Sequence, residues 1–166
     1  MAAKKNGITD TEDSLVEVLQ REKIRHLLAS ELFIVKPGTE VKEVVDLMRT
    51  QGVGCILVGS KKKLQGIFTE RDYLEKIAGH QEILNSPIDE FMSKNPVTLE
   101  GDDSVKQLIR VIVDGGYRHL PVIDGGKCIG VVDSINIFKF IADLFPSEIY
   151  NLPPSLNQVA SDVEGA

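Results

Sequence analysis

The segment Gly66-Ile67-Phe68-Thr69-Glu70-Arg71-Asp72 decides how the rest of the chain is interpreted. Residues 64–68 have the apolar pattern of a short strand, and Thr69 is a residue type that often begins a helix. The segment is therefore predicted to be a strand that turns directly into a helix. A helix start presents free N–H groups and the positive end of the helix dipole, and both favour an anion.

Thr69 and Asp72 admit two interpretations. In one, their hydroxyl and carboxylate bind a diol such as a ribose, and Gly66 lets another group approach the backbone closely. In the other, they form a capping box, in which the side chains satisfy the unpaired N–H groups of their own helix. The seven residues alone leave both interpretations open.

Composition limits the classes of protein to consider. The chain has 166 residues, of which 42% are hydrophobic and 27% charged, as expected for one ordinary domain or two small repeats. With 19 basic and 25 acidic residues the formal net charge is −6, which argues against binding nucleic acid or an anionic membrane through the whole surface. No apolar run has transmembrane length and residues 1–7 do not begin a signal peptide, so we expect a cytoplasmic protein.

The chain repeats itself with an offset of 64 positions and no gap, as the pair Val41 and Val105 illustrates. Turn glycines and apolar positions coincide together, which indicates a duplicated structural unit rather than a chance match. Further coincident pairs are Gly52 with Gly116, Val58 with Val122, Gly66 with Gly130, and Ile77 with Ile141.

Each copy is predicted to be a strand–helix–strand–strand–helix unit, so the fold class is mixed α/β (α+β), with two β-α-β-β-α units and an N-terminal helix. The predicted divisions are a flexible tail at 1–10, a helix within 11–30, the first unit at 31–79, a connector with a short helix at 80–95, the second unit at 96–145, and a flexible tail at 146–166.

Three motifs in order resemble one known family. They are Val35-Lys36-Pro37-Gly38-Thr39, the strand Arg118-His119-Leu120-Pro121-Val122-Ile123, and the Gly66–Asp72 segment. Together with the duplicated frame, they make residues 31–145 similar to a stand-alone tandem pair of cystathionine-β-synthase-type (CBS) domains. The resemblance implies that the two small sheets pack together and leave two related clefts.

Clefts of this family commonly bind adenosine-containing ligands such as AMP, ADP, ATP or S-adenosylmethionine. The resemblance therefore implies a regulatory module that senses an adenine nucleotide, AMP or ATP, and acts on a separate partner protein, with no cofactor, metal or catalysis. One alternative is a structural dimerisation module with a vestigial cleft. A second is a sensor of S-adenosylmethionine or of an NAD-type ligand.

The resemblance also implies roles for individual residues. Asp72 would bind the ribose hydroxyls and Thr69 the ribose or phosphate side, while Arg118 and His119 would face a phosphate. Alternatively, Arg118 is a solvated strand-end residue and His119 a satisfied core histidine. The remaining candidates are Val97 and Thr98 near the adenine, their first-repeat equivalents Ile34 and Val35, and Pro121 within the strand motif.

The second copy departs from the motif. Asp133 stands where the hydroxyl residue is expected, and Asn136 stands at the position of the ribose-binding aspartate. Asp133 can still cap a helix but would repel a phosphate, and Asn136 lacks the charge of a carboxylate. We therefore expect one competent cleft around Asp72 and a weak second one that includes Cys55, the counterpart of His119.

Cys55 and His119 also form the only nucleophile pair to consider. Cys55 and Cys128 lie in apolar strand-like segments, where burial raises a thiol pKa and leaves the sulfur inert, as free thiols in a reducing compartment. Enzymatic activity is therefore not expected.

The last helix of the second copy carries more apolar residues than one face needs. Ile137, Phe138 and Ile141 are predicted to pack on their own sheet, which leaves Ile135 and Phe140 for another contact. Such surplus apolar residues usually mark an interface, and CBS pairs often associate into discs of two chains, so we expect a homodimer.

Overall fold

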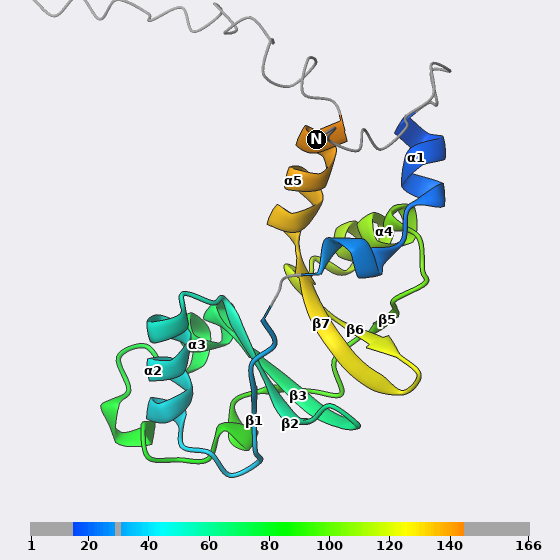
Figure 1. Cartoon of the computed structure of the whole chain (residues 1–166). Coiled ribbons are helices and arrows are strands. Elements are labelled where there is room, and N and C mark those ends of the chain that lie inside the picture. The colour runs from blue at the N-terminus through cyan, green and yellow to red at the C-terminus, as the bar shows by residue number, and fades with distance from the viewer. Residues whose placement is uncertain (1–14, 29–30, 145–166) are drawn as a thin grey trace, which may run out of the picture.

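The computed structural model describes residues 15–28 and 31–144, and within them both repeats have the expected element order (Figure 1). The first repeat contains β1 (Ile34–Val35), α2 (Val41–Gln51), β2 (Cys55–Ser60), β3 (Lys63–Thr69) and α3 (Glu70–Lys76). The second contains β5 (Leu99–Glu100), α4 (Val105–Gly115), β6 (His119–Asp124), β7 (Lys127–Asp133) and α5 (Ser134–Leu144). The mixed α/β fold with two β-α-β-β-α units is confirmed.

Each repeat builds its own small mixed sheet. β1 runs parallel to β2 and β2 antiparallel to β3, and the same arrangement recurs in β5, β6 and β7. The register also recurs, because Val58 faces Gly66 and Val122 faces Gly130, each next to an irregularity in the ladder. The first sheet gains a fourth strand from the connector, β4 (Ser93–Lys94), which the sequence did not predict.

Short segments before each repeat pack on the opposite repeat. The 3-10 helix η1 (Ile24–Leu27) places Ile24 in the core of the second repeat, and η3 (Ile88–Glu90) places Ile88 in the core of the first. Both isoleucines are fully buried, and their N–H groups donate to Asp103 O at 3.0 Å and Thr39 O at 2.8 Å. Since positions 24 and 88 differ by 64, this exchange follows the symmetry of the repeat.

The predicted N-terminal helix is divided in two. α1 (Leu15–Arg21) packs on α4, and a bridge from Lys23 to Ser104 separates it from η1. In the connector, the expected short helix is η3, which follows another 3-10 turn, η2 (Gln81–Ile83). The two tails predicted at 1–10 and 146–166 lie outside the described residues.

A third apolar cluster joins the two sheets. Leu57 and Ile67 from the first repeat pack with Cys128 from the second, and the N–H of Cys128 donates to Lys61 O at 2.7 Å. Figure 1 shows the β2–β3 hairpin next to the strands of the second repeat. The contact fixes the relative positions of β3 and β6, whose ends carry the candidate binding residues.

The prediction for α5 was partly wrong. Ile137 is buried, and Phe140 and Ile141 pack against the core of the second repeat, whereas Phe138 is 70% exposed. A helix advances by about 100° per residue, so the buried face that contains 137, 140 and 141 excludes 138. Ile135 is 58% exposed, as expected. Among the described helices, none is long and apolar enough to cross a membrane.

Candidate functional site

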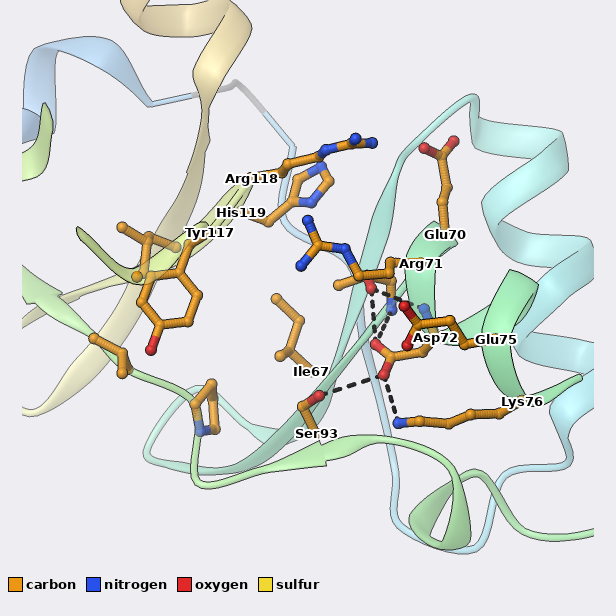
Figure 2. A pocket seen from close by; sticks show the side chains of 15 residues that line it. Ile67, Glu70, Arg71, Asp72, Glu75, Lys76, Ser93, Tyr117, Arg118 and His119 are labelled. Carbon is orange, nitrogen blue, oxygen red and sulfur yellow. Dashed lines mark hydrogen bonds and ion pairs between the residues drawn. The ribbon is translucent and has the colours of Figure 1, made fainter. Parts of the chain in front are cut away.

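A cleft of about 320 Å³ lies between the two repeats (Figure 2). This volume falls within the range of about 300–1,000 Å³ that is typical of small-molecule sites. One wall comes from the end of β3 and from α3, and the other from the residues between α4 and β6 together with the start of β6. The lining residues central to the argument are Thr69, Arg71, Asp72, Lys76, Ser93 and Val97, with Tyr117, Arg118 and His119.

Thr69 and Asp72 form the capping box at the start of α3. The Thr69 N–H and hydroxyl both donate to Asp72 Oδ2, at 3.0 and 2.7 Å, and the Asp72 N–H donates to Thr69 Oγ1 at 3.2 Å. The helix start thus uses its own side chains to satisfy these donors. Asp72 is only 6% exposed, so its carboxylate is fixed in place at the base of the cleft.

The second oxygen of Asp72 has two further partners. Lys76 Nζ pairs with Oδ1 at 2.6 Å and also donates to Phe91 O at 2.7 Å, while the Ser93 hydroxyl donates to Oδ1 at 3.3 Å. Lys76 compensates the negative charge, which a buried carboxylate requires. A carboxylate has about four acceptor positions, so these contacts occupy Asp72 fully in the structure.

Arg118 and His119 stand on the opposite wall, at the start of β6. Arg118 is exposed, while burial lowers the pKa of His119, with nearby Asp133 and Glu70 acting in the other direction. The His119 ring lies against the backbone of Gly54, where an added Cβ would be 2.8 Å from Nε2. His119 is therefore a half-buried, neutral imidazole at the boundary between the repeats, and Arg118 carries the positive charge of this wall.

Val97 lines the cleft as well, but four predicted residues do not. Thr98 is exposed just before β5, and Pro121 is buried in β6 opposite Val131. Ile34 and Val35 form β1 and pair with Leu57 and Val58. Within the cleft, the structure thus brings together Thr69, Asp72, Val97, Arg118 and His119.

Cys55 pairs with Thr69 between β2 and β3 and lies near Asp133 and Glu70, at the boundary between the repeats. Burial, followed by the charges of Asp133 and Glu70, raises the pKa of Cys55 to about 12. The thiol is therefore protonated at neutral pH, and the thiolate needed by a nucleophile is suppressed. Asn136 takes the position of Asp72 in a second capping box with Asp133.

The sequence interpretation missed several lining residues, among them Arg71, Lys76, Ser93 and Tyr117. The spacing of Asp72 and Lys76 was a usable signal, since residues four apart face each other on a helix. Tyr117 and Arg71 adjoin predicted site residues. Ser93 had no local signal, because its position depends on the pairing of β4 with β3.

Comparison with known proteins now defines the class. The CBS domain family model matches residues 24–79 and 88–143, so the chain belongs to the CBS domain family and contains two such domains. Both matches begin at the segments that pack on the opposite repeat, at Ile24 and Ile88. The duplicated unit is thus longer than the strand-to-helix repeat recognised in the sequence.

Particular relatives include small proteins of the same kind. The chain is 28% identical over 124 residues to an uncharacterized 17.7 kDa protein in the bps2 3′ region of Acidianus ambivalens, and the match covers 74% of each. The structure of CBSX2 in complex with AMP has a TM-score of 0.65 at 20% identity, covering 74% of this chain and 97% of that one.

The CBS domain pair of protein MJ0100, in complex with 5′-methylthioadenosine and S-adenosyl-L-methionine, has a TM-score of 0.66 at 18% identity. That match covers 74% of this chain and 98% of the other. At these identities both structures establish the shared fold.

Proposed function

We propose that the cleft between the repeats binds an adenine nucleotide, and that the chain is a regulatory module acting on a separate cytoplasmic partner. One observation carries the proposal: the fixed carboxylate of Asp72 lies on one wall of a cleft of about 320 Å³, and Arg118 lies on the opposite wall. A carboxylate can accept a hydrogen bond from a ribose hydroxyl, and a guanidinium presents a fork of donors to a phosphate. The ribose and the phosphate of a nucleotide are thus each matched by one wall.

The hydrogen bonds at Asp72 indicate how a ribose would enter. Thr69 and Lys76 hold the carboxylate through short contacts, whereas the Ser93 hydroxyl contributes the longest, at 3.3 Å. A ribose hydroxyl would replace Ser93 at Oδ1 at little cost, because one donor is exchanged for another. Capping and ligand binding would therefore use the same carboxylate together rather than exclude each other.

The ligands of relatives support the adenosine class. AMP, 5′-methylthioadenosine and S-adenosyl-L-methionine, seen in two structures with this fold, share an adenosine group and differ in charge at the other end. The positive Arg118 favours the anionic ligands AMP, ADP or ATP over the cationic sulfonium of S-adenosylmethionine. An S-adenosylmethionine or NAD-type sensor is the alternative that a binding panel distinguishes.

The test is calorimetric titration with AMP, ADP, ATP, NAD⁺ and S-adenosylmethionine. We expect Asp72→Ala to weaken nucleotide binding by roughly 1.5–3 kcal/mol, the range for a hydrogen bond to a charged group. Asn136→Ala removes the counterpart in the other capping box and should leave the affinity unchanged. If no adenosine ligand binds the unmodified protein, the module is structural and its cleft vestigial.

A second variant separates binding from folding. Asp72→Asn should keep the capping box, because Asn136 forms one with Asp133 at 2.8 and 3.0 Å. It should still weaken the nucleotide, by about 1 kcal/mol, because hydrogen bonds to an ionised acceptor are roughly twice as strong as neutral ones. Equal affinity of Asp72→Asn and the unmodified protein would contradict the ribose assignment.

We also infer that two copies of the chain associate through the helices of the repeats. Leu74 on α3 and Phe138 on α5 occupy equivalent positions and are 69% and 70% exposed. Val113 on α4 and Ile135 on α5 are also exposed, at 71% and 58%. Ile135 and Phe138, three residues apart, lie on one side of α5, and exposed apolar side chains of this kind favour an interface over open water.

A further inference from the structure

Arg71 connects the two repeats across the cleft. It is the second residue of α3, and its Nη2 donates to the carbonyl oxygen of Gly116, after α4, at 3.4 Å. The side chain extends from α3 toward the wall that carries Tyr117 and His119 (Figure 2). The distance lies beyond the usual 2.7–3.2 Å for such bonds, so the contact is weak and easily exchanged.

The charges of the cleft leave Arg71 available for a ligand. Lys76 is committed to Asp72 and to Phe91 O, at 2.6 and 2.7 Å. Among the described residues, neither Arg71 nor Arg118 takes part in a salt bridge, and both are exposed. The cleft therefore has two guanidinium groups outside any salt bridge among the described residues, one from each repeat, and Arg71 keeps only its weak contact with Gly116.

Two carboxylates, Glu70 and Glu75, also line the cleft and compete for these cations. Glu70 lies to one side, over Gly54, where an added Cβ would be 3.6 Å from its carboxyl carbon. Figure 2 shows the Glu70 carboxylate and the Arg71 guanidinium extending in different directions from α3. Among the described residues, neither Glu70 nor Glu75 forms a salt bridge with Arg71 or Arg118, so the two arginines offer planar, bidentate donors that an anion can engage from both repeats.

We propose that Arg71 exchanges partners when a nucleotide binds: it leaves the Gly116 carbonyl and, with Arg118, holds the phosphate. The cleft then recognises the base and the ribose of the ligand, whereas the phosphate bridges Arg71 of the first repeat and Arg118 of the second. A ligand without a phosphate occupies the cleft but does not displace Arg71 from Gly116, so the weak Arg71–Gly116 contact remains the link between the repeats. The second cleft lacks this device, because Ile135 occupies the position of Arg71.

The inference rests on the proposed function and is tested by comparing AMP with adenosine in calorimetric titrations. Arg71→Gln should weaken AMP about tenfold, equivalent to about 1.4 kcal/mol, and leave adenosine unchanged. Arg71→Lys keeps the positive charge but loses the bidentate donor geometry. Its affinity for AMP should therefore lie between those of the unmodified protein and Arg71→Gln. Arg49→Gln, on an exposed arginine of α2, is the matched control and should change neither ligand.

The outcomes separate the two proposals. An equal loss for AMP and adenosine in Arg71→Gln would show a structural role for the Gly116 contact and overturn the inference while the nucleotide site stands. Unchanged AMP affinity would overturn it as well. If the unmodified protein binds neither AMP nor adenosine, the proposed function fails, and inorganic pyrophosphate then probes the arginine pair; absence of binding overturns the inference too.

Discussion

The two repeats have the same backbone fold but carry different side chains at the equivalent helix starts. The capping box at α3 uses a threonine and a carboxylate, whereas the box at α5 uses the Asp133 carboxylate and the Asn136 amide, at 2.8 and 3.0 Å. Both boxes satisfy the helix start. The comparison shows that capping needs only a reciprocal pair of polar side chains, so a duplicated fold survives the loss of the features that suit a charged ligand.

The other cleft residues differ between the repeats as well, and the carboxylates Glu70 and Glu75 have Ser134 and Lys139 as counterparts. Every cation on the walls of the first cleft has an uncharged counterpart in the second. The pairs are Arg71 with Ile135, Lys76 with Phe140 and Arg118 with Gly54, and the neutral imidazole of His119 has the thiol of Cys55 as its counterpart. An anion therefore has two arginines as partners in the first cleft, whereas the equivalent residues of the second repeat offer no arginine and include Asp133, which repels an anion, and Lys139.

The largest expected effect concerns the outer faces of the repeats rather than their clefts. Phe138→Glu should raise the dissociation constant of the dimer about 100-fold or more, because burying an unpaired polar group costs roughly 2–7 kcal/mol. Leu74→Glu, at the equivalent position, has a similar effect if both repeats lie in the interface. Sedimentation velocity measures both. A monomeric unmodified protein at tens of micromolar would refute the dimer.

A smaller effect is expected from restoring the second motif. Asp133→Thr with Asn136→Asp should raise the number of AMP molecules bound per chain from about one toward two, because a carboxylate restores the charge-assisted acceptor. The new site should be weaker than the first, since Gly54 and Phe140 supply no cation. Calorimetric stoichiometry is the measurement. Two occupied sites in the unmodified protein would show that Asp133 and Asn136 already suffice.

The smallest effect is a pH dependence assigned to His119. Burial lowers its pKa in the folded state, so the unfolded chain binds a proton first as the pH falls below about 6.5. Folding stability from this group is therefore complete above that pH and declines as the pH falls through the folded-state pKa. His119→Gln should reduce the loss of folding free energy between pH 7.5 and 5 by less than about 1 kcal/mol. Thermal melts between pH 7.5 and 5 test this, and parallel curves would contradict the assignment.

Sequence predicted the local elements well because each repeat carries its own signals. The offset of 64 and the glycines that end α2 and α4, both with φ of +64°, define the units without tertiary information. Strand β4, and with it Ser93, arises from pairing between segments far apart in sequence. In α5, apolar residues stand at seven of the eleven positions and on more than one side of the helix, so the periodicity could not tell Phe138 from Phe140.

Of the residues that the resemblance assigned to ligand binding, those that line the cleft come from the turn between β3 and α3, from the segment before β5 and from the start of β6. Asp72 is the third residue of α3, Arg118 and His119 lie at the start of β6, and Val97 precedes β5, whereas Thr98, one residue later, does not line the cleft. Pro121 is inside β6, where pairing with Val131 buries it away from the cleft. Position along a strand, which motif matching does not resolve, decided these outcomes.

Because η1 packs on the second repeat and η3 on the first, the segment that repeats in the sequence is not the segment that forms one complete hydrophobic core. A fragment cut at the end of α3 would keep Ile24, whose core is absent, and lose Ile88, which completes its own. A fragment covering 31–95 instead holds every buried member of the first core. During synthesis, that core can close once the connector has emerged, whereas the second waits for the last helix while η1 remains without its partner surface.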